Sequence, residues 1–224
     1  MWDFVLFDLD GTLTDPKAGI TRSVRYALES FGVRVDDLDE LCAFIGPPLR
    51  ESFMKFYGFD EAQVSAAVAK YREYFSVTGI FENEVYAGVR EMLSELCERG
   101  VKVVLATSKP AVFAERILVH FNLDEYFTFV SGSELDGRRV KKADVIRYAM
   151  DNCGITDVTK AVMVGDREHD IIGARAVGMT SVGVLYGYGS REELTAVGAD
   201  HIVSDVRGLR DFLRADCSAG EFVI

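Results

Sequence analysis

The chain alternates short apolar runs with helical patterns, and this alternation limits the folds that it can adopt. The helical pattern before residue 100 places Val89, Met92, Leu93 and Leu96 on one face. Strands that alternate with amphipathic helices build a parallel sheet with helices on both faces. The sequence therefore predicts an α/β fold with a Rossmann-like sheet, whose strands are expected at 4–7, 101–106, 127–130, 161–164, 181–185 and 201–203.

One stretch, from Pro16 to about residue 83, shows helical patterns only. Asp15 can cap a helix that begins at Pro16 and ends before Gly32. Further helices are expected at 38–44, 49–57 and 61–75, and an aromatic stripe of Phe53, Phe56 and Tyr57 is expected in their core. We therefore expect two domains, a core formed by 1–15 and 84–224 and a small α-helical domain formed by 16–83.

The charge of the chain limits its partners. The 224 residues carry a formal net charge of −11, which repels phosphate polymers and anionic membranes, so we expect no nucleic-acid polymer and no membrane as partner. A small anionic substrate is compatible, because a local cation can reverse the field inside a pocket. No secretion signal or membrane-spanning apolar run is recognisable, so a cytoplasmic location is expected. The sequence leaves the oligomeric state open.

Polar side chains follow three of the predicted strands at the point where each strand ends. In an open parallel sheet, the ligand crevice lies beyond the carboxyl ends of the strands. Four acids, a hydroxyl pair and a lysine are therefore expected on one rim: Asp8, Asp10, Asp166, Asp170, Thr107, Ser108 and either Lys141 or Lys142.

Acids gathered this closely need a cation, because like charges a few ångström apart otherwise force one another to take up protons. The expected ligands are oxygens, and His169 is the one imidazole nearby in sequence. Oxygen ligands favour Mg²⁺, which takes few protein carboxylates and completes its shell with water and substrate phosphate. Asp8 and Asp166 are the expected ligands, with Asp170 bound directly or through water.

Four segments carry a family resemblance: "DLDGTLTD", "LATSKP", "VKKAD" and "VGDREHD". In order and spacing they resemble the four motifs of the haloacid dehalogenase-like hydrolase superfamily. The helical insert resembles the mobile cap of the subfamily that contains phosphoglycolate phosphatases, 5′-nucleotidase-like enzymes and β-phosphoglucomutases. The resemblance implies a haloacid dehalogenase-like core with a cap domain.

The resemblance also implies a mechanism. Asp8 would attack phosphorus and form an aspartyl phosphate, and Asp10 would protonate the leaving group and then activate water. Mg²⁺ would bind Asp8, the backbone carbonyl of Asp10, Asp166 and a phosphate oxygen, with Asp170 bound directly or through water. The implied function is a magnesium-dependent phosphatase for a small phosphomonoester, similar to phosphoglycolate phosphatases or 5′-nucleotidases.

The phosphoryl group would be bound by Thr107, Ser108 and a lysine. Most relatives have a single lysine before a proline, whereas this chain has "VKKAD". Counting back from the following helix favours Lys142 over Lys141.

Two loops are expected near the same crevice. The "GPPL" turn of the insert is expected to contact the leaving group through Gly46, Pro47 and Arg50. The strand-end loop "YGYGS", Tyr186 to Ser190, contains glycines that fit either a plain turn or a close backbone approach.

Three other functions share these motifs or this chemistry. A sugar-phosphate mutase similar to β-phosphoglucomutase would return the phosphoryl group to its product. A pyrophosphatase would split diphosphate. A phosphoacceptor or binding domain also uses strand-end aspartates, Mg²⁺, a hydroxyl and a lysine, although a helical cap argues against it.

Overall fold

The computed structural model describes residues 1–215 of the chain. The chain divides into two compact units: unit 1 comprises Met1–Leu13 and the chain from Tyr86 onward, and unit 2 comprises Thr14–Val85. The divisions lie after Leu13 and Val85, whereas the sequence predicts them after residues 15 and 83. That the two units act as a core domain and a cap domain stays a prediction.

A six-stranded sheet with the order β5-β4-β1-β6-β7-β8 forms the centre of unit 1. Every neighbouring pair of strands is parallel, which confirms the predicted α/β class. The strands are β1 Phe4–Phe7, β4 Lys102–Pro110, β5 Phe127–Ser133, β6 Ala161–Gly165, β7 Thr180–Val184 and β8 His201–Val203.

Strand β4 is longer than predicted. It was expected to end at Ala106 but continues to Pro110, where it still pairs with Ser133 of β5. Thr107 and Ser108 therefore lie inside the strand rather than after it. The apolar run alone set the expected end, and it could not reveal pairing that continues through polar residues.

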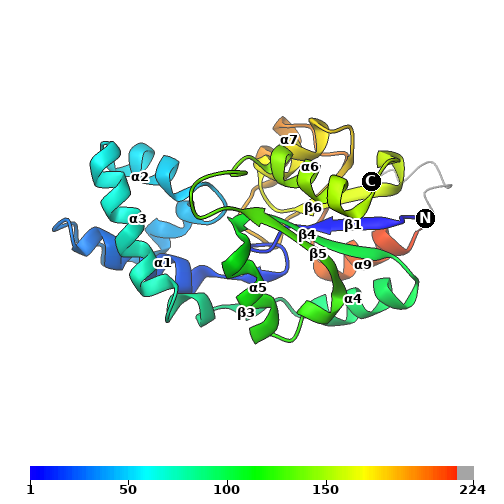
Figure 1. Ribbon diagram of the computed structural model, residues 1–224, viewed down its shortest axis with the longest axis horizontal. Helices are drawn as coiled ribbons and strands as arrows, with labels where there is room; N and C mark the ends of the chain where they lie inside the picture. Colours follow the sequence, from blue (N-terminus) through cyan, green and yellow to red (C-terminus); the bar gives the residue numbers. More distant parts are fainter. Residues whose placement is uncertain (216–224) are drawn as a thin grey trace. The chain divides into compact units, whose positions relative to one another are not determined.

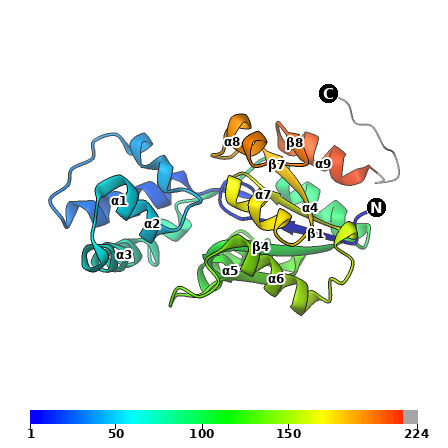
Figure 2. The same cartoon turned by 90° about the horizontal axis from the view of Figure 1, so that it is seen from above.

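Helices cover both faces of this sheet (Figure 1). Helices α6 and α7 lie on one face, and α4, α5 and α9 lie on the other. Figure 2 shows α9 beside β8 at one edge of the sheet and α5 beside β4 toward the other. The helices of unit 1 are α4 Val89–Glu98, α5 Ala111–His120, α6 Lys142–Cys153, α7 Glu168–Arg175, α8 Arg191–Ala196 and α9 Val206–Arg214, with short 3₁₀ turns at Asp124–Tyr126 and Val158–Lys160.

The core between the sheet and helices α6 and α7 is built from the predicted apolar positions. Leu6 of β1, Met163 of β6 and Ile146 of α6 all lie in one buried cluster. Burying an aliphatic side chain of this size contributes about 1.5–3 kcal/mol. Gly154 ends α6 with a φ of 68°, a conformation that favours glycine. This packing fixes the start of α6 against the strand ends.

Unit 2 is the helical region that the sequence indicated. Helix α1 begins at Lys17, whose backbone N–H donates to the carboxylate of Asp15 at 3.0 Å. Pro16, and not Asp15 as predicted, is the N-cap residue, and the helix begins one residue later than predicted. The helices of unit 2 are α1 Lys17–Glu29, α2 Leu49–Tyr57 and α3 Glu61–Phe75, with 3₁₀ helices at Leu38–Phe44 and Gly79–Phe81.

Two very short strands in unit 2 were not predicted. β2, Thr14–Asp15, pairs antiparallel with β3, Glu84–Val85. Two residues are too few to show the alternation by which a strand is recognised in a sequence. This pairing brings the two ends of the helical region side by side.

The aromatic side chains of α2 differ in their burial. Phe53 is fully buried and stacks on Phe59, with ring centroids 5.9 Å apart. Phe56 is 42% exposed, so its predicted place in the core is wrong. Three residues turn a helix by about 300°, so Phe56 lies about 60° away from the buried face of Phe53. Tyr57 is half-buried.

No helix within residues 1–215 combines the length and the apolar character needed to cross a lipid bilayer.

Candidate active site

The order of the strands brings distant polar residues together. β1 lies between β4 and β6, and Phe7, its last residue, pairs with Leu105 on one side and Val164 on the other. The next residue, Asp8, donates its backbone N–H to the carbonyl of Val164 at 2.9 Å. Since the strand order reverses at β1, a ligand crevice is expected at these strand ends.

Three carboxylates meet at this edge of the sheet. Asp8, Asp166 and Asp170 are 7%, 0% and 1% exposed. Each offers one oxygen, and these oxygens lie within 4.8 Å of one another. Burial, together with the charges of Asp170 and Asp8, raises the pKa of Asp166 well above its usual value. Burial also raises the pKa of Asp170. The cluster is therefore unfavourable unless positive charge is supplied.

Lys142 supplies part of that charge. Its Nζ lies 3.0 Å from Oδ1 of Asp8 and 2.7 Å from Oδ1 of Asp170, and it donates to the carbonyl of Ala106 at 2.9 Å. Burial opposes its charge, but the carboxylates of Asp170 and Asp8 outweigh burial and raise the pKa of Lys142. The neighbouring Lys141 is exposed. Of the two lysines that the sequence offered, the structure thus brings Lys142 to the acids.

The charges in this cluster fit a divalent cation. Three carboxylates and one ammonium leave an excess of two negative charges. Oδ1 of Asp8 and Oδ1 of Asp170 are buried and lie 3.0 and 2.7 Å from Nζ of Lys142. Oxygens that are buried, charged and close together form a donor set for a hard metal ion. Asp8, Asp166 and Asp170 therefore fit a divalent metal.

Asp10 has a partner that was not predicted from the sequence. Nζ of Lys109 lies 2.8 Å from both carboxylate oxygens of Asp10. The two side chains are 7% and 11% exposed. Burial raises the pKa of Asp10, although the charge of Lys109 opposes this. Lys109 belongs to the "TSK" segment, from which only Thr107 and Ser108 were selected, and its place at the same strand end was the available signal.

The two hydroxyl residues differ in their surroundings. Thr107 is 2% exposed, and its Oγ1 accepts a hydrogen bond from the backbone N–H of Lys109 at 3.2 Å. Ser108 is half-buried, and its carbonyl accepts a hydrogen bond from Ser133 at 2.7 Å. The binding of phosphate by these residues stays a prediction.

Gly11 is required by the close approach of Asp166. Its φ is 81°, and a Cβ atom added there would lie 2.2 Å from Oδ2 of Asp166. The following residue, Thr12, donates its hydroxyl to Oδ1 of Asp166 at 3.2 Å. The turn after β1 therefore contains Asp8 and Asp10 and also contacts Asp166 through Gly11 and Thr12.

The predicted leaving-group residues lie in unit 2. Gly46 has a φ of 101°. Arg50, in α2, forms an ion pair with Glu61 and donates to the hydroxyl of Ser65 at 3.3 Å. A contact of Gly46, Pro47 or Arg50 with a substrate stays a prediction.

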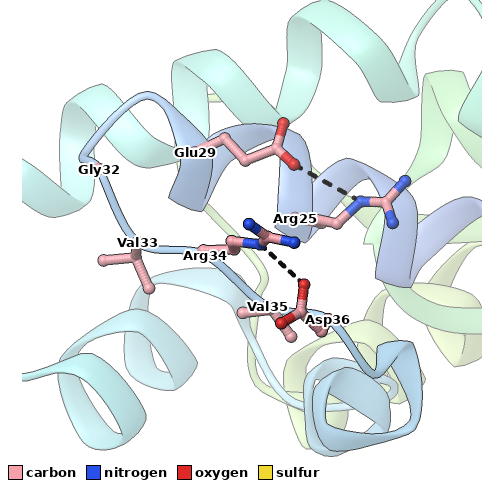
Figure 3. Close-up of a pocket in the computed structure, with 7 residues that line it drawn as sticks. All are labelled: Arg25, Glu29, Gly32, Val33, Arg34, Val35 and Asp36. Atoms are coloured by element: carbon pink, nitrogen blue, oxygen red, sulfur yellow. Dashed lines mark hydrogen bonds and ion pairs between the residues drawn. The ribbon is translucent and has the colours of Figure 1, made fainter.

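A separate hollow of about 490 Å³ lies on unit 2 beside the end of α1 (Figure 3). Its charged groups face one another: Arg25 lies 3.8 Å from Glu29, and Arg34 lies 2.8 Å from Asp36. The hollow is distinct from the cluster of Asp8, Asp166 and Asp170, because those three residues belong to unit 1.

Comparisons with known proteins agree with this geometry. The sequence profile described as haloacid dehalogenase-like hydrolase matches residues 5–184. The chain belongs to this family. The family prediction and the prediction of a hydrolase are therefore confirmed.

Three relatives of this family are particularly similar. A 5′-nucleotidase of Pseudomonas aeruginosa is 49% identical over 94% of this chain and 95% of its own length. Tyrosine-protein kinase PtkA of Mycobacterium tuberculosis is 40% identical over 83% of this chain, but the match spans 62% of that protein. The crystal structure of a predicted phosphatase from Clostridium acetobutylicum has a TM-score of 0.92 and 50% identity, covering 95% of this chain and 98% of its own.

Proposed function

We propose that this protein is a magnesium-dependent phosphatase that hydrolyses a small phosphomonoester, with a 5′-nucleotide as the first candidate substrate. The observation that carries the proposal is the buried cluster of Asp8, Asp166 and Asp170 around Lys142. Similarity to a 5′-nucleotidase along nearly the whole chain supports the choice of substrate. Phosphoglycolate, suggested by the resemblance, is the second candidate.

In this proposal Asp8 is the nucleophile. One carboxylate oxygen attacks phosphorus, the bond to the leaving oxygen breaks, and an aspartyl phosphate forms. Lys142 has two roles in this step. Its ammonium restrains Asp8 through the 3.0 Å ion pair, and it offsets the negative charge of the phosphoryl group. Thr107 and Ser108 would bind the phosphoryl oxygens.

The proposed metal ligands are Asp8, the backbone carbonyl of Asp10, Asp166 and Asp170. When bound, Mg²⁺ would neutralise charge on the carboxylates and on the phosphoryl oxygens. Oxygen donors favour this ion over softer metals.

Asp10 is the proposed acid and base. Its raised pKa favours the protonated form, which can give a proton to the departing oxygen. The resulting carboxylate then takes a proton from the water that hydrolyses the aspartyl phosphate. Lys109, at 2.8 Å, orients this carboxyl group.

The test is phosphate release from nucleoside 5′-monophosphates, phosphoglycolate, sugar phosphates, diphosphate and an aryl phosphate, each with and without Mg²⁺. We expect magnesium-dependent release from a 5′-nucleotide and none from the Asp8→Asn variant. Asp3→Asn is the matched control, because Asp3 lies just before β1 and 3.5 Å from Lys160. Release that is unchanged in Asp8→Asn contradicts the mechanism.

The same panel separates the alternatives. A mutase would require a sugar bisphosphate for turnover, and a pyrophosphatase would prefer diphosphate. Because one relative is named a tyrosine-protein kinase, transfer of phosphate to a protein tyrosine instead of water is a further outcome to test. Release from no substrate at all would favour a phosphoacceptor or binding domain.

A further inference from the structure

The loop that follows β7 carries a second set of contacts to the acid cluster. This loop contains Tyr186, Gly187, Tyr188 and Gly189 and leads to Ser190, which caps α8. The backbone N–H of Tyr188 donates to Oδ2 of Asp166 at 2.8 Å. Since Thr12 donates to the other oxygen at 3.2 Å, both carboxylate oxygens of Asp166 are hydrogen-bonded by neighbouring chain segments.

The two glycines of the loop allow it to approach Asp166 this closely. A Cβ atom added at Gly187 would lie 2.3 Å from the carbonyl oxygen of Gly11 and 2.4 Å from Cβ of Asp166. One added at Gly189 would lie 1.9 Å from the carbonyl oxygen of Asp166. Of the two sequence interpretations of "YGYGS", the structure therefore supports the close backbone approach over the plain turn.

Tyr186 links this loop to the turn after β1. Its hydroxyl donates to the backbone carbonyl of Thr12 at 2.9 Å. Its ring packs edge-on against Tyr86, with ring centroids 5.1 Å apart. Burial, Asp166 and Tyr86 raise the pKa of Tyr186, so the phenol keeps its proton and stays a donor.

These contacts form a closed ring around Asp166. The ring runs from Tyr186 to Thr12, from Thr12 to Asp166, from Asp166 to Tyr188, and back along the chain to Tyr186. Lys142 holds the other two acids by ion pairs. Hydrogen bonds behind a metal ligand fix its orientation and strengthen binding of the ion.

We propose that Tyr186 is a positioning residue for the metal site, acting through Thr12 to hold Asp166 in the orientation that binds a divalent cation. The inference rests on the metal-dependent function proposed above. It gives a role to the loop 186–190, which the sequence places near the crevice without assigning it a function.

The test measures binding of Mn²⁺ or Mg²⁺ by calorimetry, without substrate. We expect Tyr186→Phe, which removes only the hydroxyl, to weaken binding about threefold to tenfold, the range of one hydrogen bond. Thr12→Val removes a hydroxyl that contacts Asp166 directly and should weaken binding about tenfold to a hundredfold. Tyr148→Phe is the matched control, because the Tyr148 ring packs on Phe129 and Arg139, and its metal affinity should be unchanged.

The double variant shows whether Tyr186 acts through Thr12. If it does, Tyr186→Phe has little further effect once Thr12 is valine. Metal affinity of Tyr186→Phe equal to that of the unaltered protein overturns the inference, even if its melting temperature falls, because a merely structural role predicts that result. If Tyr186→Phe does not fold, unchanged affinity in Thr12→Val overturns it instead.

The measurement also separates this inference from the proposed function. A protein that binds metal and responds to Tyr186→Phe, yet releases no phosphate, refutes the phosphatase and leaves the positioning role standing. An unaltered protein that binds no divalent metal refutes both.

Discussion

Replacing Lys142 with methionine tests the electrostatics of the acid cluster. The Lys142 side chain is 3% exposed and lies 3.0 and 2.7 Å from two carboxylates that are almost fully buried. Methionine has a similar length but no charge, so the variant leaves Asp8 and Asp170 without their ion-pair partner. Removing one partner of a buried ion pair costs about 3–5 kcal/mol.

That cost gives a measurable change in melting temperature. In a chain of this size, 1 kcal/mol shifts the melting temperature by about 2–4 °C, so Lys142→Met should melt roughly 6–20 °C lower in EDTA. The difference in melting temperature between Lys142→Met and the unaltered protein should become smaller as the pH falls. Burial raises the pKa of Asp166 and Asp170, and protonation of these carboxylates removes their repulsion. Saturating Mg²⁺ should stabilise the variant more than the unaltered protein.

Lys141→Met is the control for this experiment. Lys141 is the preceding residue in the chain and is exposed, so its replacement should change stability by less than about 0.5 kcal/mol. Equal melting temperatures for the two variants in EDTA would refute the reasoning, because the cluster would then not depend on the buried ammonium.

Three further predictions concern other parts of unit 1. Asp10→Ala should slow hydrolysis of alkyl phosphates by about 10²–10⁴-fold and of aryl phosphates much less, in steady-state assays; equal losses argue against general acid catalysis. Gly165→Ala should lower stability by about 1–3 kcal/mol in urea unfolding, because the new Cβ would lie 2.2 Å from Cγ of Asp170; unchanged stability would contradict that close approach. Glu95→Gln should lower the melting temperature at neutral pH, because Arg214 and Arg210 lower the pKa of Glu95 from 4.5 to about 2. The stabilisation by the Glu95 carboxylate is present above pH 4.5 and disappears as the pH falls toward 2. A difference in melting temperature between Glu95→Gln and the unaltered protein that stays the same across this pH range would contradict the prediction.

The sheet could be predicted from the sequence because its strands are continuous apolar runs. A run such as Phe4–Phe7 is typical of a strand buried on both faces, and its end locates Asp8. Parallel pairing then brings Asp166 to the same edge. The positions of Asp8 and Asp166 could therefore be predicted from these two general rules.

The contacts that hold the acids could not be predicted in the same way. Lys109 meets Asp10 across 99 residues of chain, and Tyr186 meets Thr12 across 174. Such pairs depend on how far β4 extends and how the loop after β7 folds, and neither is encoded in a local pattern. The partial exposure of Phe56 could not be predicted from a local pattern either, because neighbouring elements decide which side of α2 is covered.

The place where the helical insert leaves unit 1 has a consequence for protein engineering. Leu13 and Tyr86, which flank the insert, are joined by a backbone hydrogen bond of 3.1 Å from Tyr86 to Leu13. A tight turn of a few residues can therefore replace residues 14–85 without stretching the sheet. Such a shortened protein would retain Asp8, Asp166, Asp170 and Lys142, and it offers a scaffold into which specificity elements from other hydrolases can be grafted.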